Sequence, residues 1–118
     1  MTTTQAPTNE VRLVGRVSGE PTARELPSGD QLVQLRVVVD RPPRRGDGGR
    51  RQVDTIDVAC WSARTRVSAQ RLSEGHVVEV EGSLRRRFFA TGAGRASRYE
   101  VEATRLRRAR GSVKKTGV

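Results

Sequence analysis

Aromatic side chains are almost absent from this sequence. Phe, Trp and Tyr make up 3% of its 118 residues, and they are Trp61, Phe88, Phe89 and Tyr99. Two of them, Trp61 and Phe89, fall on strand-like segments whose alternation points them away from the core. Apolar residues as a whole account for 34% of the chain, so we expect a modest core. A small β-domain with such a core often gains stability by forming oligomers.

Cysteine and histidine are equally scarce. The one cysteine, Cys60, excludes an intrachain disulfide framework, and the one histidine, His76, has no cluster of metal ligands around it in the sequence. Asp54 and Asp57 lack a partner base, nucleophile or metal ligand. The sequence therefore predicts a protein that is not an enzyme and takes no cofactor or metal. No targeting segment and no apolar run of transmembrane length is apparent, so we expect a soluble protein in a reducing cytoplasm.

Positive charge is abundant and unevenly distributed. The formal net charge is +10, and nearly all basic residues are arginine, a bias that codon usage in a GC-rich genome can also produce. Residues 41–51 hold five arginines and one acid, residues 85–98 hold five arginines and no acid, and residues 105–115 hold six basic residues and no acid. Such clustering favours a polyanionic partner, and a solvated surface is the alternative for each cluster taken alone.

Alternation of apolar and polar residues predicts five strands. They are expected near residues 11–17, 32–40, 53–61, 76–87 and 99–104. Gly15 interrupts the first pattern and indicates a bend or a close backbone approach. The third strand is expected to point Cys60 into the core.

A short helix is predicted over residues 63–73. Ser62 can cap its start, Ala63, Val67 and Leu72 supply a thin apolar stripe, and Gly75 is a plausible stop. Three strands, one helix and two more strands predict an all-β fold, a five-stranded OB-fold barrel with one short helix between strands 3 and 4. The face and loops of that fold bind oligonucleotides.

Several segments, in order and with compatible spacing, carry a resemblance to a known family. They are Asn9–Val17, Pro21, the Pro27-Ser28-Gly29 turn, Leu72–Arg85 and Tyr99-Glu100-Val101. Together they resemble the bacterial single-stranded DNA-binding proteins over roughly Asn9 to Leu106.

The resemblance implies that bases stack on aromatic rings at a few positions. One such position falls at Trp61 and another at Phe89, and two more fall near Pro43 and at Thr55, where this chain has no ring. For Trp61 the alternative is a structural role, sealing the barrel against the helix. Phe88 is also assigned to the nucleic-acid surface, but it should face away from its neighbour, and Phe89 is expected to be the binder.

Arginines complete the predicted surface. Strand alternation sends Arg85 and Arg87 to the side of Phe89, where they can pair with phosphate or lie on a base. The other candidates are the strand residues Arg12, Arg16 and Arg36 and the loop residues Arg44, Arg45, Arg50 and Arg51. Rings that stack on bases and cations that meet phosphates predict single-stranded DNA binding without sequence preference.

The expected organisation has three parts: a flexible extension over residues 1–8, the binding domain over 9–106, and a short basic, disordered tail over 107–118. The tail shows no acidic tip, so the resemblance implies a short paralog that does not recruit replication proteins in that way. Expected partners are single-stranded DNA and further copies of the chain, as a homotetramer or alternatively a dimer, in the nucleoid. Roles in replication, recombination and repair stay open. The rival functions are a tail-less interaction module of the replication-restart kind and RNA binding.

Overall fold

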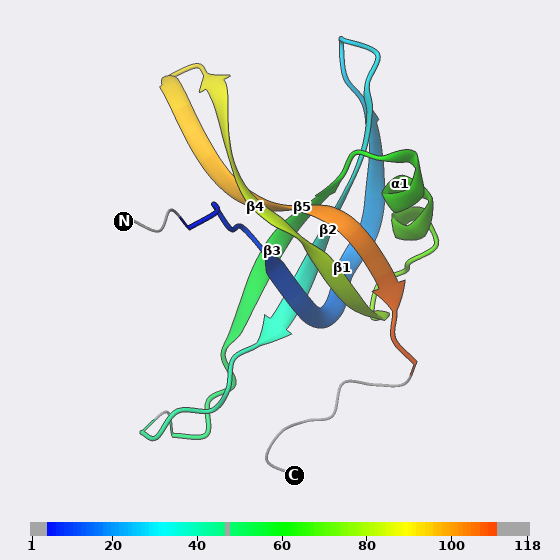
Figure 1. Cartoon of the computed structure of the whole chain (residues 1–118). Coiled ribbons are helices and arrows are strands. Elements are labelled where there is room, and N and C mark those ends of the chain that lie inside the picture. Colours follow the sequence, from blue (N-terminus) through cyan, green and yellow to red (C-terminus); the bar gives the residue numbers. More distant parts are fainter. Residues whose placement is uncertain (1–4, 47, 111–118) are drawn as a thin grey trace.

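The computed structural model describes residues 5–46 and 48–110. Its elements are β1 (Val11–Glu25), β2 (Gln31–Asp40), β3 (Val53–Cys60), α1 (Ala63–Gln70), β4 (Val77–Thr91) and β5 (Gly94–Arg108). The strands close into a barrel in the order β1-β2-β3-β5-β4 (Figure 1). The predicted five-stranded OB-fold barrel, with one short helix between the third and fourth strands, is confirmed. Within the described ranges, α1 falls short of the length and apolarity that a membrane-crossing helix requires.

The barrel interior is built from alternate residues of every strand. On β2 these are Val33, Leu35 and Val37, all buried, whereas Arg36 between them is exposed, as the alternation predicts. Burying each such aliphatic side chain contributes about 1.5–3 kcal/mol to the stability of the fold, so many small core residues together stabilise the barrel. Cys60 belongs to this core, and burial raises the pKa of its thiol to about 12.

Two glycines allow strands to cross closely. A Cβ on Gly15 would collide with the carbonyl oxygen of Val38, and one on Gly82 would collide with that of Glu102. The predicted close approach at Gly15 is therefore confirmed. Gly82 adjoins the register shift between β4 and β5, so it also lies where the pairing of these two strands is adjusted.

The β4–β5 hairpin is longer than the sequence pattern predicts. Pairing continues to Thr91 and Gly94, and only Gly92 and Ala93 remain to form the tip. The hairpin projects well beyond the barrel (Figure 1). Because the outer part of the hairpin has no core to cover, its residues show no burial alternation, and backbone pairing alone extends the strands.

The helix differs from its prediction in length and in its buried face. Ser62 caps it as expected, since its Oγ accepts a 3.1 Å hydrogen bond from the Thr65 amide. The helix ends at Gln70, three residues early, and it buries Thr65 and Ala69, whereas Val67 is 49% exposed. The predicted stripe through Val67 is wrong. The helix has almost no apolar face of its own, and its contacts with the barrel bury the side that carries Thr65 and Ala69. Gly75 instead forms the turn before β4, with φ of +87°.

The last strand continues beyond residue 106, where the binding domain was predicted to end. β5 runs to Arg108, and the Ala109 amide then donates to the Val77 carbonyl at 2.8 Å, so ordered structure continues past residue 106. Residues 111–118 of the predicted tail and residues 1–4 of the predicted extension lie outside the described residues.

The close approach at Gly82 predicts a large effect of a single methyl group. Gly82→Ala should lower the free energy of unfolding by about 1–3 kcal/mol, because the added Cβ has to push two strands apart. The matched control is Gly92→Ala, since nothing lies within 4 Å of the position of its Cβ and its φ is not left-handed. Urea unfolding of both variants measures the effect, and equal stabilities would contradict it.

Candidate nucleic-acid interface

The pairing of β4 with β5 gives the hairpin two faces. We define the front face as Arg85, Arg87 and Phe89 of β4 with Arg98, Glu100 and Glu102 of β5, because cross-strand partners such as Arg85 and Glu100 lie on the same side of a sheet. Phe89 is 42% exposed there, and the guanidinium carbon of Arg98 lies 5.8 Å from the centre of its ring. The structure thus places Arg85, Arg87 and Phe89 on one side, where the alternation puts them.

Trp61 joins the front face from another element. It directly follows β3 and is half-buried, and the guanidinium carbon of Arg87 lies 4.4 Å from the centre of its ring. Its carbonyl accepts a 3.2 Å hydrogen bond from Arg66 of α1, whose same nitrogen also donates to the Gln31 carbonyl at 3.1 Å. Trp61 is therefore attached to α1 through its backbone carbonyl and contacts the hairpin through its ring.

A buried carboxylate holds Arg87 in place. Glu100 is only 5% exposed and forms an ion pair with the Arg87 guanidinium, which also lies over Trp61. A cation so held covers one face of the indole, at a distance where attraction between guanidinium and ring is expected. A base that stacks on Trp61 therefore has to use the uncovered part of the ring or displace Arg87.

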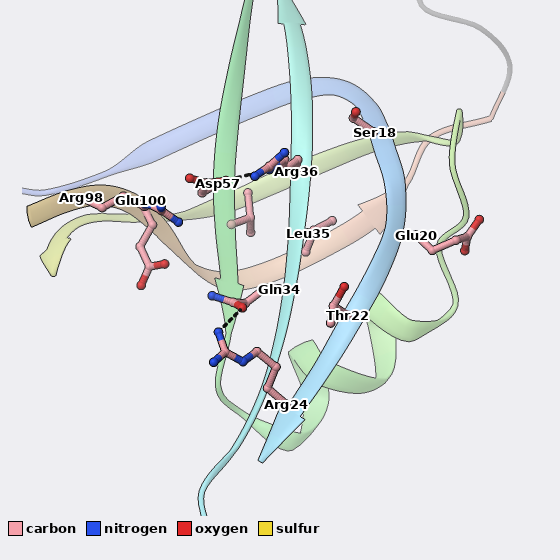
Figure 2. Close-up of a pocket in the computed structure, with 11 residues that line it drawn as sticks. Ser18, Glu20, Thr22, Arg24, Gln34, Leu35, Arg36, Asp57, Arg98 and Glu100 are labelled. Atoms are coloured by element: carbon pink, nitrogen blue, oxygen red, sulfur yellow. Dashed lines mark hydrogen bonds and ion pairs between the residues drawn. The ribbon is translucent and has the colours of Figure 1, made fainter. Parts of the chain in front are cut away.

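A groove of about 390 Å³ opens beside the front face. It is lined by Ser18, Glu20, Thr22, Arg24, Gln34, Leu35, Arg36, Asp57, Val58, Arg98 and Glu100. Figure 2 shows Arg36 beside Asp57 and Arg24 beside Gln34 on neighbouring strands, with Arg98 and Glu100 reaching in from the hairpin. Because polar and charged side chains make up most of the lining, the groove suits a hydrated, charged chain better than an apolar molecule.

All five strand arginines predicted to meet phosphate are already paired with a carboxylate. Besides Arg87, the pairs are Arg12 with Glu79 at 3.2 Å, Arg16 with Asp40 at 3.3 Å, Arg36 with Asp57 at 3.3 Å and Arg85 with Glu102 at 2.8 Å. Arg12 and Arg16 lie on β1 and do not line the groove, so the structure does not bring them to the front face.

The loop arginines are placed apart from the front face. Arg44, Arg45, Arg50 and Arg51 are all exposed in the connection between β2 and β3, which projects from the barrel (Figure 1). Beside this loop, Arg41 forms a 2.7 Å ion pair with Asp54, and the hydrogen bond in that pair lowers the pKa of the carboxyl.

The hairpin also carries Phe88, which was predicted as a site residue, and two exposed residues that were not, Tyr99 and Arg98. Phe88 points away from Phe89 and lies near Arg86 and Arg95, at 4.9 Å and 5.5 Å from ring centre to guanidinium carbon. Tyr99 and Arg98 are also exposed on this hairpin. The sequence pattern did not predict Arg98 and Tyr99 as site residues, because their placement depends on the two-residue tip between residues 91 and 94, which the alternation does not predict.

Among the described residues, no group of three or more His, Cys, Asp or Glu side chains is arranged to hold a metal ion.

A closed five-stranded barrel with its helix after the third strand defines the OB-fold class. Residues 8–109 match the model of the Single-strand binding protein family, and the chain belongs to this family. The chain is not an enzyme, because the family that it belongs to is one of single-strand binding proteins.

Named relatives agree with this assignment. The "Single-stranded DNA-binding protein" of Treponema pallidum (strain Nichols) is 30% identical over 101 residues, which cover 86% of this chain and 57% of the relative. The protein of the same name from Thermosynechococcus vestitus is 32% identical over 77 residues, 65% of this chain and 60% of the relative. The chain thus spans somewhat more than half the length of these curated relatives.

The solved structures bear on the fold. A "Plasmodium falciparum SSB complex with ssDNA" superposes with a TM-score of 0.76 at 19% identity, covering 91% of this chain and 99% of that one. A deletion mutant of the single-stranded DNA binding protein from Thermus aquaticus has a TM-score of 0.74 at 22% identity, covering 88% of this chain and 51% of that one.

The Arg87–Glu100 pair predicts a stability effect that depends on charge. Arg87→Ala leaves Glu100 buried without its partner and should lower the free energy of unfolding by about 1–3 kcal/mol. Adding Glu100→Gln removes the charge and should restore much of this loss. Arg85→Ala is the matched control, because its pair with Glu102 is largely exposed and should be worth less than about 1 kcal/mol. Urea unfolding measures all three variants, and a double variant no more stable than Arg87→Ala would contradict the explanation.

Glu79 predicts a dependence of stability on pH. The hydrogen bond from Arg12 lowers its pKa, and the charges of Arg12 and Arg107 lower it further. A carboxyl whose pKa is lower in the folded state stabilises the fold above its unfolded pKa, and this contribution is lost as the pH falls through its folded pKa. Glu79→Gln should therefore be less stable than the parent at neutral pH, and the difference should shrink in acid. Thermal unfolding against pH measures this, with exposed Glu25→Gln as the control; a difference that grows in acid would contradict it.

Proposed function

We propose that this protein binds single-stranded DNA non-covalently and without sequence preference, through the front face and the adjoining groove. The observation that carries the proposal is the meeting of Trp61 and Phe89 on one face, each with a guanidinium group against its ring. Of the four positions at which the family resemblance implies stacking, these are the two that carry a ring in this chain. The names of the relatives in Treponema and Thermosynechococcus support the same function.

In the proposed mechanism, rings and cations act on different parts of the strand. Bases stack on Phe89 and on the accessible part of Trp61, at about 1–3 kcal/mol per base. Arg98 and the exposed loop residues Arg45, Arg50 and Arg51 meet phosphates. The arginines paired with carboxylates contribute less, because each has to exchange an existing ionic partner for a phosphate.

The different roles of rings and arginines have a consequence for the affinity for single-stranded DNA. Thr55 and Pro43 offer no ring where the resemblance implies further stacking positions, so a larger share of the binding energy falls to phosphate contacts. The protein is then expected to be strongly sensitive to salt, and to protect single strands exposed during replication, recombination or repair.

The proposed function includes self-association. We propose a homotetramer, with a homodimer as the alternative, and exposed Val14 on β1 and Val53 on β3 support an apolar contact between copies. Light scattering at several protein concentrations measures the assembly.

Trp61 fluorescence tests the proposed function directly. Trp61 is the only tryptophan, so titration with oligo-dT should quench a signal from one site. Raising the salt should weaken binding with a slope near −0.7 for each phosphate contacted. Duplex DNA is the control, and a matched RNA oligonucleotide distinguishes DNA from RNA binding. Equal affinity for duplex and single-stranded DNA, or an affinity that does not change with salt, would contradict the proposal.

Substitutions on the front face separate stacking from charge. Phe89→Ala should weaken binding of oligo-dT by about 1–3 kcal/mol, and Arg98→Gln should reduce the salt slope by about 0.7. Arg64→Gln removes the same charge from the exposed surface of α1 and should change neither quantity. Fluorescence titration at several salt concentrations measures both. If Arg64→Gln weakens binding as much as Arg98→Gln does, net charge and not the front face governs affinity.

A further inference from the structure

The β4–β5 hairpin has a second face that the proposed function does not use. We define the back face as Arg86 and Phe88 of β4 with Arg95, Ser97 and Tyr99 of β5, which the register places on the side opposite Phe89. Phe88 and Tyr99 are each 57% exposed, more than either ring of the front face. Two large rings are therefore displayed to solvent on one side of a projecting hairpin.

The exposure of these rings follows from the length of the hairpin. Within the barrel, the same alternating positions of β4 and β5 carry core residues such as Val80 and Val101, which are buried. Beyond the barrel the positions continue through Leu84 to Phe88 and Tyr99, and within the described part of the chain no further strand covers them. The back face therefore continues, beyond the barrel, the side of the hairpin that faces the core within it.

The charge of the back face defines what can cover it. Residues 86–99 contain no Asp or Glu, and of their four arginines Arg86 and Arg95 lie on the back face. The guanidinium carbon of Arg86 lies 4.9 Å from the centre of the Phe88 ring and 5.5 Å from that of Tyr99, and Arg95 lies 5.5 Å from Phe88. On the front face, by contrast, Glu100 and Glu102 neutralise Arg87 and Arg85. The back face therefore suits an anionic partner with flat, stackable groups.

We propose that the back face is a second contact surface for single-stranded DNA, on which bases stack against Phe88 and Tyr99 while Arg86 and Arg95 meet phosphates. This inference rests on the proposed function and extends the path of the strand. Between the two faces the tip is formed by Gly92 and Ala93, small residues that let a strand leave Phe89 and pass around the hairpin. A second copy of the chain is the less suitable occupant, because this face would bring arginines together with no acid of its own to pair with them.

A relocated tryptophan tests where the strand runs. Trp61→Phe combined with Tyr99→Trp leaves one tryptophan, on the back face, and titration with a long oligo-dT should quench it. Trp61→Phe combined with Val67→Trp places the reporter on the exposed surface of α1 and should not be quenched. Quenching at residue 99 but not at residue 67 supports the inference. Undiminished emission at residue 99, under conditions where the same variant is shown to bind by anisotropy of a labelled oligo-dT, overturns it.

Substitutions on the back face give an independent measurement. Phe88→Ala should weaken binding of long oligo-dT about fivefold or more and leave a short oligo-dT, which the front face accommodates, nearly unaffected. Arg86→Gln should reduce the salt slope for the long strand by about 0.7, and Arg64→Gln is the matched control. Unchanged affinity for both lengths overturns the inference.

The remaining outcomes are also decisive. Variants that change the molecular mass in light scattering without changing DNA affinity overturn the inference and assign the back face to contacts between copies. Failure of the parent protein to bind oligo-dT at all defeats the proposed function itself, which the Trp61 titration reveals separately. Both faces have exposed side chains, so circular dichroism should show each variant to be folded.

Discussion

The register between β4 and β5 determines the whole chemistry of the hairpin. Because successive side chains of a strand point to opposite sides, slipping β4 by a single residue against β5 would move Phe89 to the face of Tyr99 and break the contact of Arg87 with Trp61. The register is set inside the barrel, where the shift next to Gly82 coincides with a point at which a side chain would strike the neighbouring backbone. A packing constraint in the barrel therefore decides which rings meet which guanidinium groups on the exposed hairpin.

Charge is organised by the same pairing. The net charge of +10 suggests a uniformly basic surface, but many arginines of the barrel strands lie beside a carboxylate. The outer hairpin differs because residues 86–99 contain no acid. The attraction for a polyanion is therefore strongest at the projecting parts of the molecule, where an extended strand first meets it.

How far the sequence predicts this structure depends on whether a segment faces a core. Alternation of apolar and polar residues predicts the strands of the barrel. The side chain of Ser62 predicts the start of the helix, and the lone glycine at Gly15 predicts the close crossing of strands. The outer hairpin has no buried side, so its strands show no alternation of apolar and polar residues from which their length could be predicted. The helix α1 is too polar for its sequence to indicate which face is buried. The partners of Arg36 and Arg85 were invisible for another reason: ion pairs across strands depend on register, which only the closed barrel supplies. The placement of Trp61 and Phe89 on one face was predictable, but the covering of Trp61 by Arg87 was not.

The burial of Cys60 has a practical consequence. Its thiol is the only one in the chain, lies wholly inside the barrel, and has a pKa raised to about 12, so almost none of it is the reactive thiolate at neutral pH. A thiol reagent can reach it only when β3 separates from its neighbours. The rate at which this cysteine is alkylated therefore reports how often the folded barrel opens, and a bound ligand that clamps the barrel slows the reaction without touching the sulfur.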